Sequence, residues 1–155
     1  MSKMLFVLIF ASVVLVTPGQ EQKPLSELIE ATKSRYKSGQ VWRYKTRPGE
    51  EDSSLIVVKV ENHPKMGNII HIGLRNLRMK NPHNQEGYSD TALHLPFAEE
   101  AIDKSVVKIL EEKAKLPAFE EGYSLWREAF DAGKAGIYTI TIAEAVEIME
   151  KSLNQ

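Results

Sequence analysis

Hydrophobic and polar residues are arranged in three ways along this chain. Residues 4–16 form one run without a charge, residues 41–80 carry short apolar stretches between turn residues, and residues 96–153 carry apolar positions three or four apart. These patterns are typical of a secretory signal, of β-strands and of amphipathic helices, respectively. We therefore expect a leader sequence followed by a domain that combines a sheet with helices.

The leader sequence has the parts of a signal peptide. Lys3 supplies a positive charge, residues 4–16 supply the apolar segment, and Gly19 is a small residue suited to a cleavage site. The apolar run is shorter than the roughly 20 residues of a transmembrane helix. We predict that residues 1–19 are the signal peptide and that residues 20–155 are a single globular domain in the periplasm or outside the cell.

Strand patterns occur mainly between residues 41 and 95. Apolar, β-branched and aromatic residues alternate or run together, and turn or loop residues at 48–49, 62–67 and 81–90 separate the stretches. Neighbouring strands joined by short turns favour antiparallel pairing. The predicted strands are residues 41–46, 55–60, 69–72 with a continuation through Leu77 and Met79, 91–95 and, further along the chain, 137–141.

Helical spacing is clearest in the C-terminal half. An apolar stripe follows residues 96–112, and an aromatic stripe, expected to be core, runs from Phe119 to Phe130. Thr141 and Glu144 have the spacing of a capping box, which starts a helix. Together with the strands, the helices indicate an α+β fold, a small bent antiparallel sheet or half-barrel with packed helices. The predicted helices are residues 24–36, 96–112, 119–132 and 142–153.

Composition narrows the classes of function. The chain has 20 Lys and Arg against 21 Asp and Glu, so it lacks the basic surplus of nucleic-acid-binding domains. It has no cysteine, which excludes a lipoprotein anchor and disulfides. It has no Asn-x-Ser/Thr acceptor, which favours a bacterial source. We predict no cofactor, no nucleic-acid partner and no stable membrane span.

Cationic and aromatic side chains alternate along the first predicted strand. Period two puts the cations on one face and the aromatic rings on the other, and two arginines near the third strand would extend the positive surface. Such a surface suits an anionic ligand or an acidic partner. The alternative is a solvated strand face paired with the acidic residues 50–52. The predicted binding residues are Arg43, Lys45, Arg47, Trp42, Tyr44, Arg75 and Arg78.

Two of the four histidines, His71 and His94, fall in predicted strands and would meet across the sheet if those strands are neighbours. With a carboxylate such as Glu99 they would form an acid–base or metal site. The plainer interpretation is a pair of partly buried histidines bonded to the backbone. The sequence has neither a Gly-x-Ser-x-Gly motif nor a cysteine nucleophile.

These observations lead to one functional prediction and one alternative. We predict an exported, non-enzymatic binding protein that contacts a protein partner or a small anionic ligand through the cationic strand and its adjacent loops. The alternative is a small hydrolase, with or without a metal ion, that relies on His71, His94 and Glu99.

Overall fold

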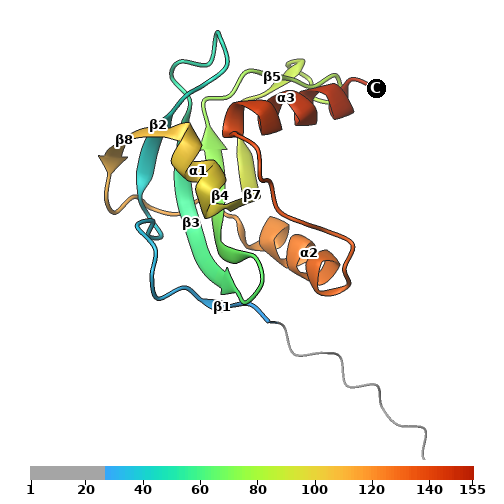
Figure 1. The fold of residues 1–155 in the computed structure, drawn as a ribbon. Helices are drawn as coiled ribbons and strands as arrows, with labels where there is room; N and C mark the ends of the chain where they lie inside the picture. Colours follow the sequence, from blue (N-terminus) through green and yellow to red (C-terminus); the bar gives the residue numbers. More distant parts are fainter. Residues whose placement is uncertain (1–26) are drawn as a thin grey trace, which may run out of the picture.

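A six-stranded sheet is the centre of the fold, which the computed structural model describes for residues 27–155 (Figure 1). The strand order is β7-β4-β3-β2-β8, and β1 pairs with β3. These pairs are antiparallel, and one parallel bridge joins Phe97 to Tyr138. The predicted signal peptide, residues 1–19, lies outside the described residues. The strands are β1 (Ile29–Glu30), β2 (Val41–Tyr44), β3 (Ser54–His63), β4 (Gly67–Arg75), β7 (Ala92–Ala98) and β8 (Val106–Glu111).

Three helices and a small second sheet complete the described part of the chain. The helices are α1 (Glu99–Ser105), α2 (Glu120–Asp131) and α3 (Ile142–Leu153), and the second sheet pairs β5 (Met79–Lys80) with β6 (Tyr88–Ser89). The predicted fold class, α+β with an antiparallel sheet and packed helices, is therefore confirmed. None of the helices in residues 27–155 is long and apolar enough to span a membrane.

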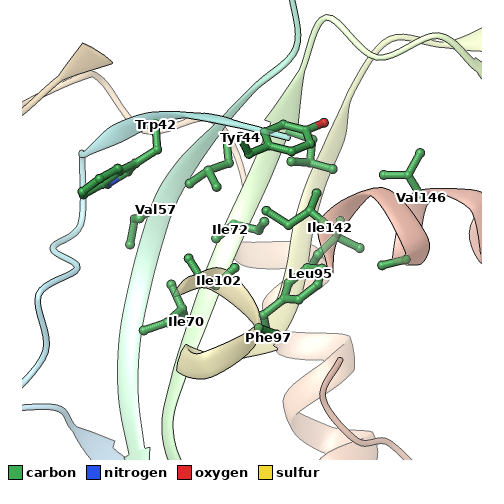
Figure 2. Packing of buried hydrophobic residues seen from close by; sticks show 14 of the residues in the cluster. Trp42, Tyr44, Val57, Ile70, Ile72, Leu95, Phe97, Ile102, Ile142 and Val146 are labelled. Carbon is green, nitrogen blue, oxygen red and sulfur yellow. The ribbon is translucent and has the colours of Figure 1, made fainter. Parts of the chain in front are cut away.

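Helices α1 and α3 cover one face of the sheet, which we call the core face. Figure 2 shows Ile70 and Ile72 of β4 and Phe97 of β7 gathered with Ile102 of α1 and Ile142 of α3. All five side chains are fully buried. Burying one such side chain stabilises a fold by about 1.5–3 kcal/mol, so this face holds a large share of the stability.

Helix α2 and the segment before it cover the opposite face, which we call the α2 face. His71 lies between Ile70 and Ile72 in β4, so the alternation of a strand turns it away from the core face. Helix α2 has no fully buried side chain. The apolar cluster here is small and consists of Val41, Ile56 and Val58 with Ala114, Leu116 and Phe119.

A bulge in β3 decides which side chains reach the α2 face. Val57 pairs with Ile72, but the next pair joins Lys59 to His71, so β3 has one extra residue at this point. An extra residue reverses the alternation of the side chains that follow it. Glu61 therefore lies on the α2 face with His71 instead of on the core face.

The predicted helix of residues 96–112 is wrong at both ends. Helix α1 covers only Glu99–Ser105, since Pro96 belongs to β7 and Val106–Glu111 forms β8. β8 pairs with the edge of β2, whose backbone groups would otherwise lack partners in the sheet. The spacing of apolar residues fits a helix, but β-branched residues at 106 and 107 and the pairing with β2 favour a strand.

The first predicted helix, residues 24–36, is also wrong in its described part. β1 pairs with the end of β3, and Tyr36 enters the core face. Its ring packs edge-on against Trp42 with centroids 5.6 Å apart, and its hydroxyl donates to Asp103 at 2.6 Å. These long-range contacts replace the helix that the apolar spacing indicated.

Three predicted strands are shorter than expected, and the first of them, predicted for residues 41–46, ends at Tyr44 as β2. β4 ends at Arg75, because Asn76 has a φ of 56°, and the chain then turns into β5. Residues 137–141 make only the single bridge of Tyr138 to Phe97.

The two C-terminal helices are confirmed as α2 and α3. Gly133 follows α2 with a φ of 69°, a conformation that glycine adopts without strain. The side chain of Thr141 accepts from the Glu144 amide, and the Glu144 carboxylate accepts from the Thr141 amide at 2.8 Å. Both signals are local in sequence, which is why the sequence predicts them well.

Candidate functional site

A chain of hydrogen bonds crosses three neighbouring strands on the α2 face. Oε2 of Glu61 in β3 lies 3.1 Å from Nε2 of His71 in β4. Nδ1 of His71 lies 2.9 Å from Nε2 of His94 in β7. His71 is fully buried and Glu61 nearly so, while His94 keeps some exposure. The three side chains form a continuous polar path from the interior to a partly exposed imidazole.

Strand register brings these side chains together. His71 lies opposite Lys59 in β3 and opposite Pro96 in β7. Glu61 and His94 are each two residues from those partners, so both are diagonal neighbours of His71 on the same face. Diagonal neighbours lie about 7–8 Å apart at their α-carbons, within reach of long or aromatic side chains.

Helix α2 supplies two further partners of Glu61, and Lys59 of β3 lies 3.7 Å from its Oε1. The Tyr123 hydroxyl donates to Oε1 of Glu61 at 2.9 Å, and Nη1 of Arg127 donates to the same oxygen at 3.4 Å and to the Tyr123 hydroxyl at 2.8 Å. The Trp126 ring packs edge-on against His71 with centroids 4.9 Å apart. The network therefore attaches α2 to the sheet through polar and aromatic contacts.

The protonation of the buried pair follows from its surroundings. Burial opposes the charge of Glu61, but hydrogen bonds from His71 and Tyr123 outweigh it and lower the pKa of this carboxyl. Burial lowers the pKa of His71, and Glu61 only partly offsets this. At neutral pH the pair is a carboxylate and a neutral imidazole. Because a carboxylate only accepts, Nε2 of His71 carries the proton and Nδ1 of His71 is an acceptor.

The same logic assigns the tautomer of His94. Nδ1 of His71 accepts, so Nε2 of His94 donates, and Nδ1 of His94 keeps a free lone pair. Burial, followed by the proximity of His71, lowers the pKa of His94 to about 4. At neutral pH this imidazole is uncharged and presents a hydrogen-bond acceptor.

Gly122 of α2 lies directly against His94. A Cβ at position 122 would be 3.0 Å from Cβ of His94 and 3.9 Å from its Nδ1. This separation is tighter than nine in ten real Cβ contacts, so a glycine at position 122 allows α2 to lie this close to β7 without displacing His94.

A pocket opens beside His94, between β7, α2 and the segment before α3. Its volume is about 480 Å³, within the range of small-molecule sites. Trp126 is fixed at its edge, since its Nε1 donates to the carbonyl of Gly136 at 2.8 Å. The lining is mainly apolar. Its polar side-chain atoms belong to His94, Trp126 and Tyr138. The lining residues are His94, Leu95, Pro96, Gly122, Trp126, Gly136, Ile137 and Tyr138.

The structure brings His71 and His94 together, as the sequence analysis expected for neighbouring strands. It places Glu99 on the other side of the sheet, where Ser34 donates to it at 2.7 Å and Asn68 at 2.6 Å. Glu61 holds the position of the carboxylate instead. The sequence offers no signal for Glu61, because simple alternation along β3 would direct it to the core face.

The residues of the predicted binding strand differ in their surroundings. Trp42 and Tyr44 are buried in the core face, so their rings are not available to a ligand. Arg47 makes a two-pronged pair with the buried Glu50, at 2.9 and 2.7 Å, and also reaches Glu150 at 3.3 Å. Of the acidic residues 50–52, Glu50 is therefore enclosed and paired with Arg47, whereas Glu51 and Asp52 are exposed.

The other cationic residues predicted to bind a ligand do not form one continuous surface. Arg43 pairs in register with Ser54, which pairs with Arg75, and Arg43 also pairs with Lys108 of β8. Directly opposed residues share a face, so three cations form one row across the sheet. Lys45 is exposed and donates to the Lys104 carbonyl at 3.2 Å.

Arg78 lies apart from this row, with its guanidinium 5.8 Å from the ring centre of Tyr88. Lys108 is the member of the row that the sequence analysis missed, because its strand was predicted to be helical.

Within residues 27–155, no group of three or more His, Asp or Glu side chains has an arrangement that could hold a metal ion. Searches of the sequence against protein-family models and curated proteins, and of the fold against solved structures, found no match.

Proposed function

We propose that this protein is a binding protein whose ligand occupies the pocket beside His94. The observation that carries the proposal is the buried Glu61–His71 pair, which holds His94 as a neutral acceptor at the edge of a mainly apolar pocket. An apolar cavity with a few fixed polar groups is the usual form of a small-molecule site.

The chemistry of His94 favours binding over catalysis. A general base works best with a pKa near the working pH, and the pKa of His94 is about 4. The pocket lining also contains no serine, threonine, lysine or carboxylate side chain that could act as a nucleophile. The predicted alternative, a hydrolase, has a histidine chain to support it but lacks these partners.

The pocket can be tested by filling it. Gly136 lines the pocket, and a Cβ there would meet no atom within 4 Å, so the backbone at this position has room for a side chain. We expect saturation-transfer NMR to detect toluene bound to the purified protein, and Gly136→Leu to weaken that binding at least tenfold. Thr139→Leu, an exposed position on the same segment, is the matched control and retains binding. Equal binding to the native protein and Gly136→Leu would place the probe elsewhere.

The second candidate function is recognition of an acidic partner by the row of Lys108, Arg43 and Arg75. Nε of Arg75 is buried and has no hydrogen-bond partner in the described chain, so this guanidinium is not fully paired within residues 27–155. Strands are spaced about 4.8 Å apart, so the row extends about 14 Å and suits an extended acidic segment.

A hexaglutamate peptide is a suitable probe for this row. The double variant Arg43→Glu and Lys108→Glu changes two exposed side chains without disturbing the Arg47–Glu50 pair. We expect it to abolish binding of the peptide, whereas Lys65→Glu with Lys134→Glu, which changes net charge equally, retains binding. If both double variants lose binding of the peptide equally, the peptide responds to the net charge of the protein and not to this row.

Export is part of the proposal and rests on the signal-like pattern of residues 1–19. Expression in a Gram-negative host should yield a periplasmic protein whose intact mass corresponds to a chain beginning at Gln20. A cytoplasmic protein that retains Met1–Ser2–Lys3 would contradict it.

A further inference from the structure

The pocket beside His94 offers one strong hydrogen-bonding preference. Glu61 requires the proton on Nε2 of His71, and His71 in turn requires the proton on Nε2 of His94. Nδ1 of His94 is thus held as a lone pair by two successive hydrogen bonds. A ligand that donates to this atom satisfies it, whereas a ligand with only acceptors leaves it unpaired.

Charge narrows the class of ligand further. The lining contains no Lys or Arg side chain, and its histidine is neutral at pH 7. A carboxylate or phosphate would lose its hydration there without gaining an opposite charge. The site therefore selects a neutral molecule.

The walls of the pocket suit a flat ring. Trp126 is fixed by its bond to the Gly136 carbonyl, and Tyr138 packs on the buried Phe97 with centroids 5.0 Å apart. Both rings are held in place before any ligand enters, so little side-chain freedom is lost on binding. Aromatic rings pack favourably against other rings in offset or edge-to-face arrangements.

We infer that the ligand of this pocket is a neutral aromatic molecule with an O–H or N–H donor, of the phenol or indole class, which donates to Nδ1 of His94. This inference rests on the proposed function and specifies the chemistry of the same site. It assigns His94 the role of a specificity-determining residue, and Glu61 and His71 the role of positioning residues.

Three probes of similar size test the inference on the native protein. 4-Methylphenol has the donor, 4-methylanisole carries a methyl group in its place, and 4-methylbenzoate adds a negative charge. Because an unpaired acceptor costs binding energy, we expect isothermal titration at pH 7.5 to show 4-methylphenol binding about tenfold more tightly than 4-methylanisole. We expect no detectable binding of 4-methylbenzoate.

A variant separates the role of His94 from that of the pocket walls. His94→Phe keeps an aromatic ring of similar size but removes the acceptor, so both neutral probes should bind this variant equally well. Because this change also leaves Nδ1 of His71 without its donor, circular dichroism must first show a folded variant. The comparison of probes on the native protein does not depend on that result.

The outcomes distinguish a failure of the proposed binding function from a failure of the inferred donor preference. If none of the probes binds the native protein, the proposed function fails. If toluene and both neutral probes bind equally, the pocket is real and the inference about the donor is wrong. Tighter binding of 4-methylbenzoate than of 4-methylphenol would also overturn it.

Discussion

The two faces of the sheet are built from the same strands but differ in what holds them. On the core face, fully buried aliphatic side chains such as Ile70 and Ile72 pack against α1 and α3. On the α2 face, His71 of the same strand bonds to Glu61 and His94, and α2 contributes no fully buried residue. Because side chains alternate along each strand, the residues that stabilise the core and those that form the candidate site lie on opposite faces of the same sheet.

The separation has an energetic reason. Apolar burial is favourable whatever the orientation of the groups, whereas a buried polar chain is favourable only when every donor and acceptor is paired. The α2 face meets this condition for Glu61 and His71 and leaves one acceptor, Nδ1 of His94, at the pocket. A binding site formed in this way can be altered without loss of the core.

The largest expected effect is on the core face. Ile72→Ala removes a fully buried side chain, and we expect a loss of about 2–5 kcal/mol in the free energy of unfolding. Urea denaturation at pH 7.5 measures it. Val107→Ala, an exposed position on β8, should change the stability by less than about 0.5 kcal/mol. Similar losses in the two variants would mean that the core face is not the main source of stability.

A smaller effect is expected from the centre of the α2 face. Glu61→Ala leaves the Nε2 proton of His71 and the Tyr123 hydroxyl without their acceptor, and we expect a loss of about 1–3 kcal/mol. Glu121→Ala, an exposed carboxylate of α2, is the control and should be close to neutral. If Glu61→Ala costs no more than the control, the polar network does not stabilise the fold.

Acidification should weaken the α2 face selectively. The pKa of His94 is about 4 in the folded protein against an ordinary value near 6.5, so the unfolded chain takes up a proton that the folded state resists. The contribution of His94 to the free energy of unfolding is therefore fully present above about pH 6.5 and is lost as the pH decreases towards 4. The lowered pKa values of His71 and Glu61 act in the same direction.

After allowance for the partial exposure of His94, we expect a decrease of about 1 kcal/mol between pH 7 and pH 5. The midpoint of urea denaturation measures this decrease. His94→Gln should reduce the pH dependence, whereas His83→Gln, in an exposed loop, should leave it unchanged. An identical pH profile for His94→Gln and the native protein would assign the effect to other groups.

The smallest expected effect concerns two glycines of the pocket. Gly122→Ala places a Cβ 3.0 Å from His94, and the crowding should exceed the gain in helix propensity, for a net loss of about 0.5 kcal/mol. Gly136→Ala meets open space and should be neutral or slightly stabilising. Thermal denaturation of the two variants in parallel tests this. A stabilised Gly122→Ala would show that α2 can move away from β7.

Local signals in the sequence predicted local structure well. The aromatic stripe of residues 119–130 and the capping box at Thr141 identify α2 and α3 because each depends on residues within a few positions of one another. The helix predicted for residues 96–112 failed where a distant segment, the edge of β2, competed for the same backbone. The candidate site follows the same rule, since His71 and His94 were predictable from strand patterns and Glu61 was not.

The class of the fold, the presence of two histidines in strands, and the positions of α2 and α3 follow from the amino-acid sequence alone. Apolar periodicity and capping act over a few residues, so they can be read from the sequence. Two features become visible only in the folded protein: the bulge in β3 that directs Glu61 to the α2 face, and the close contact of α2 with His94 at Gly122. Both depend on how separate segments meet, because register and close packing are set by partners far away in the chain.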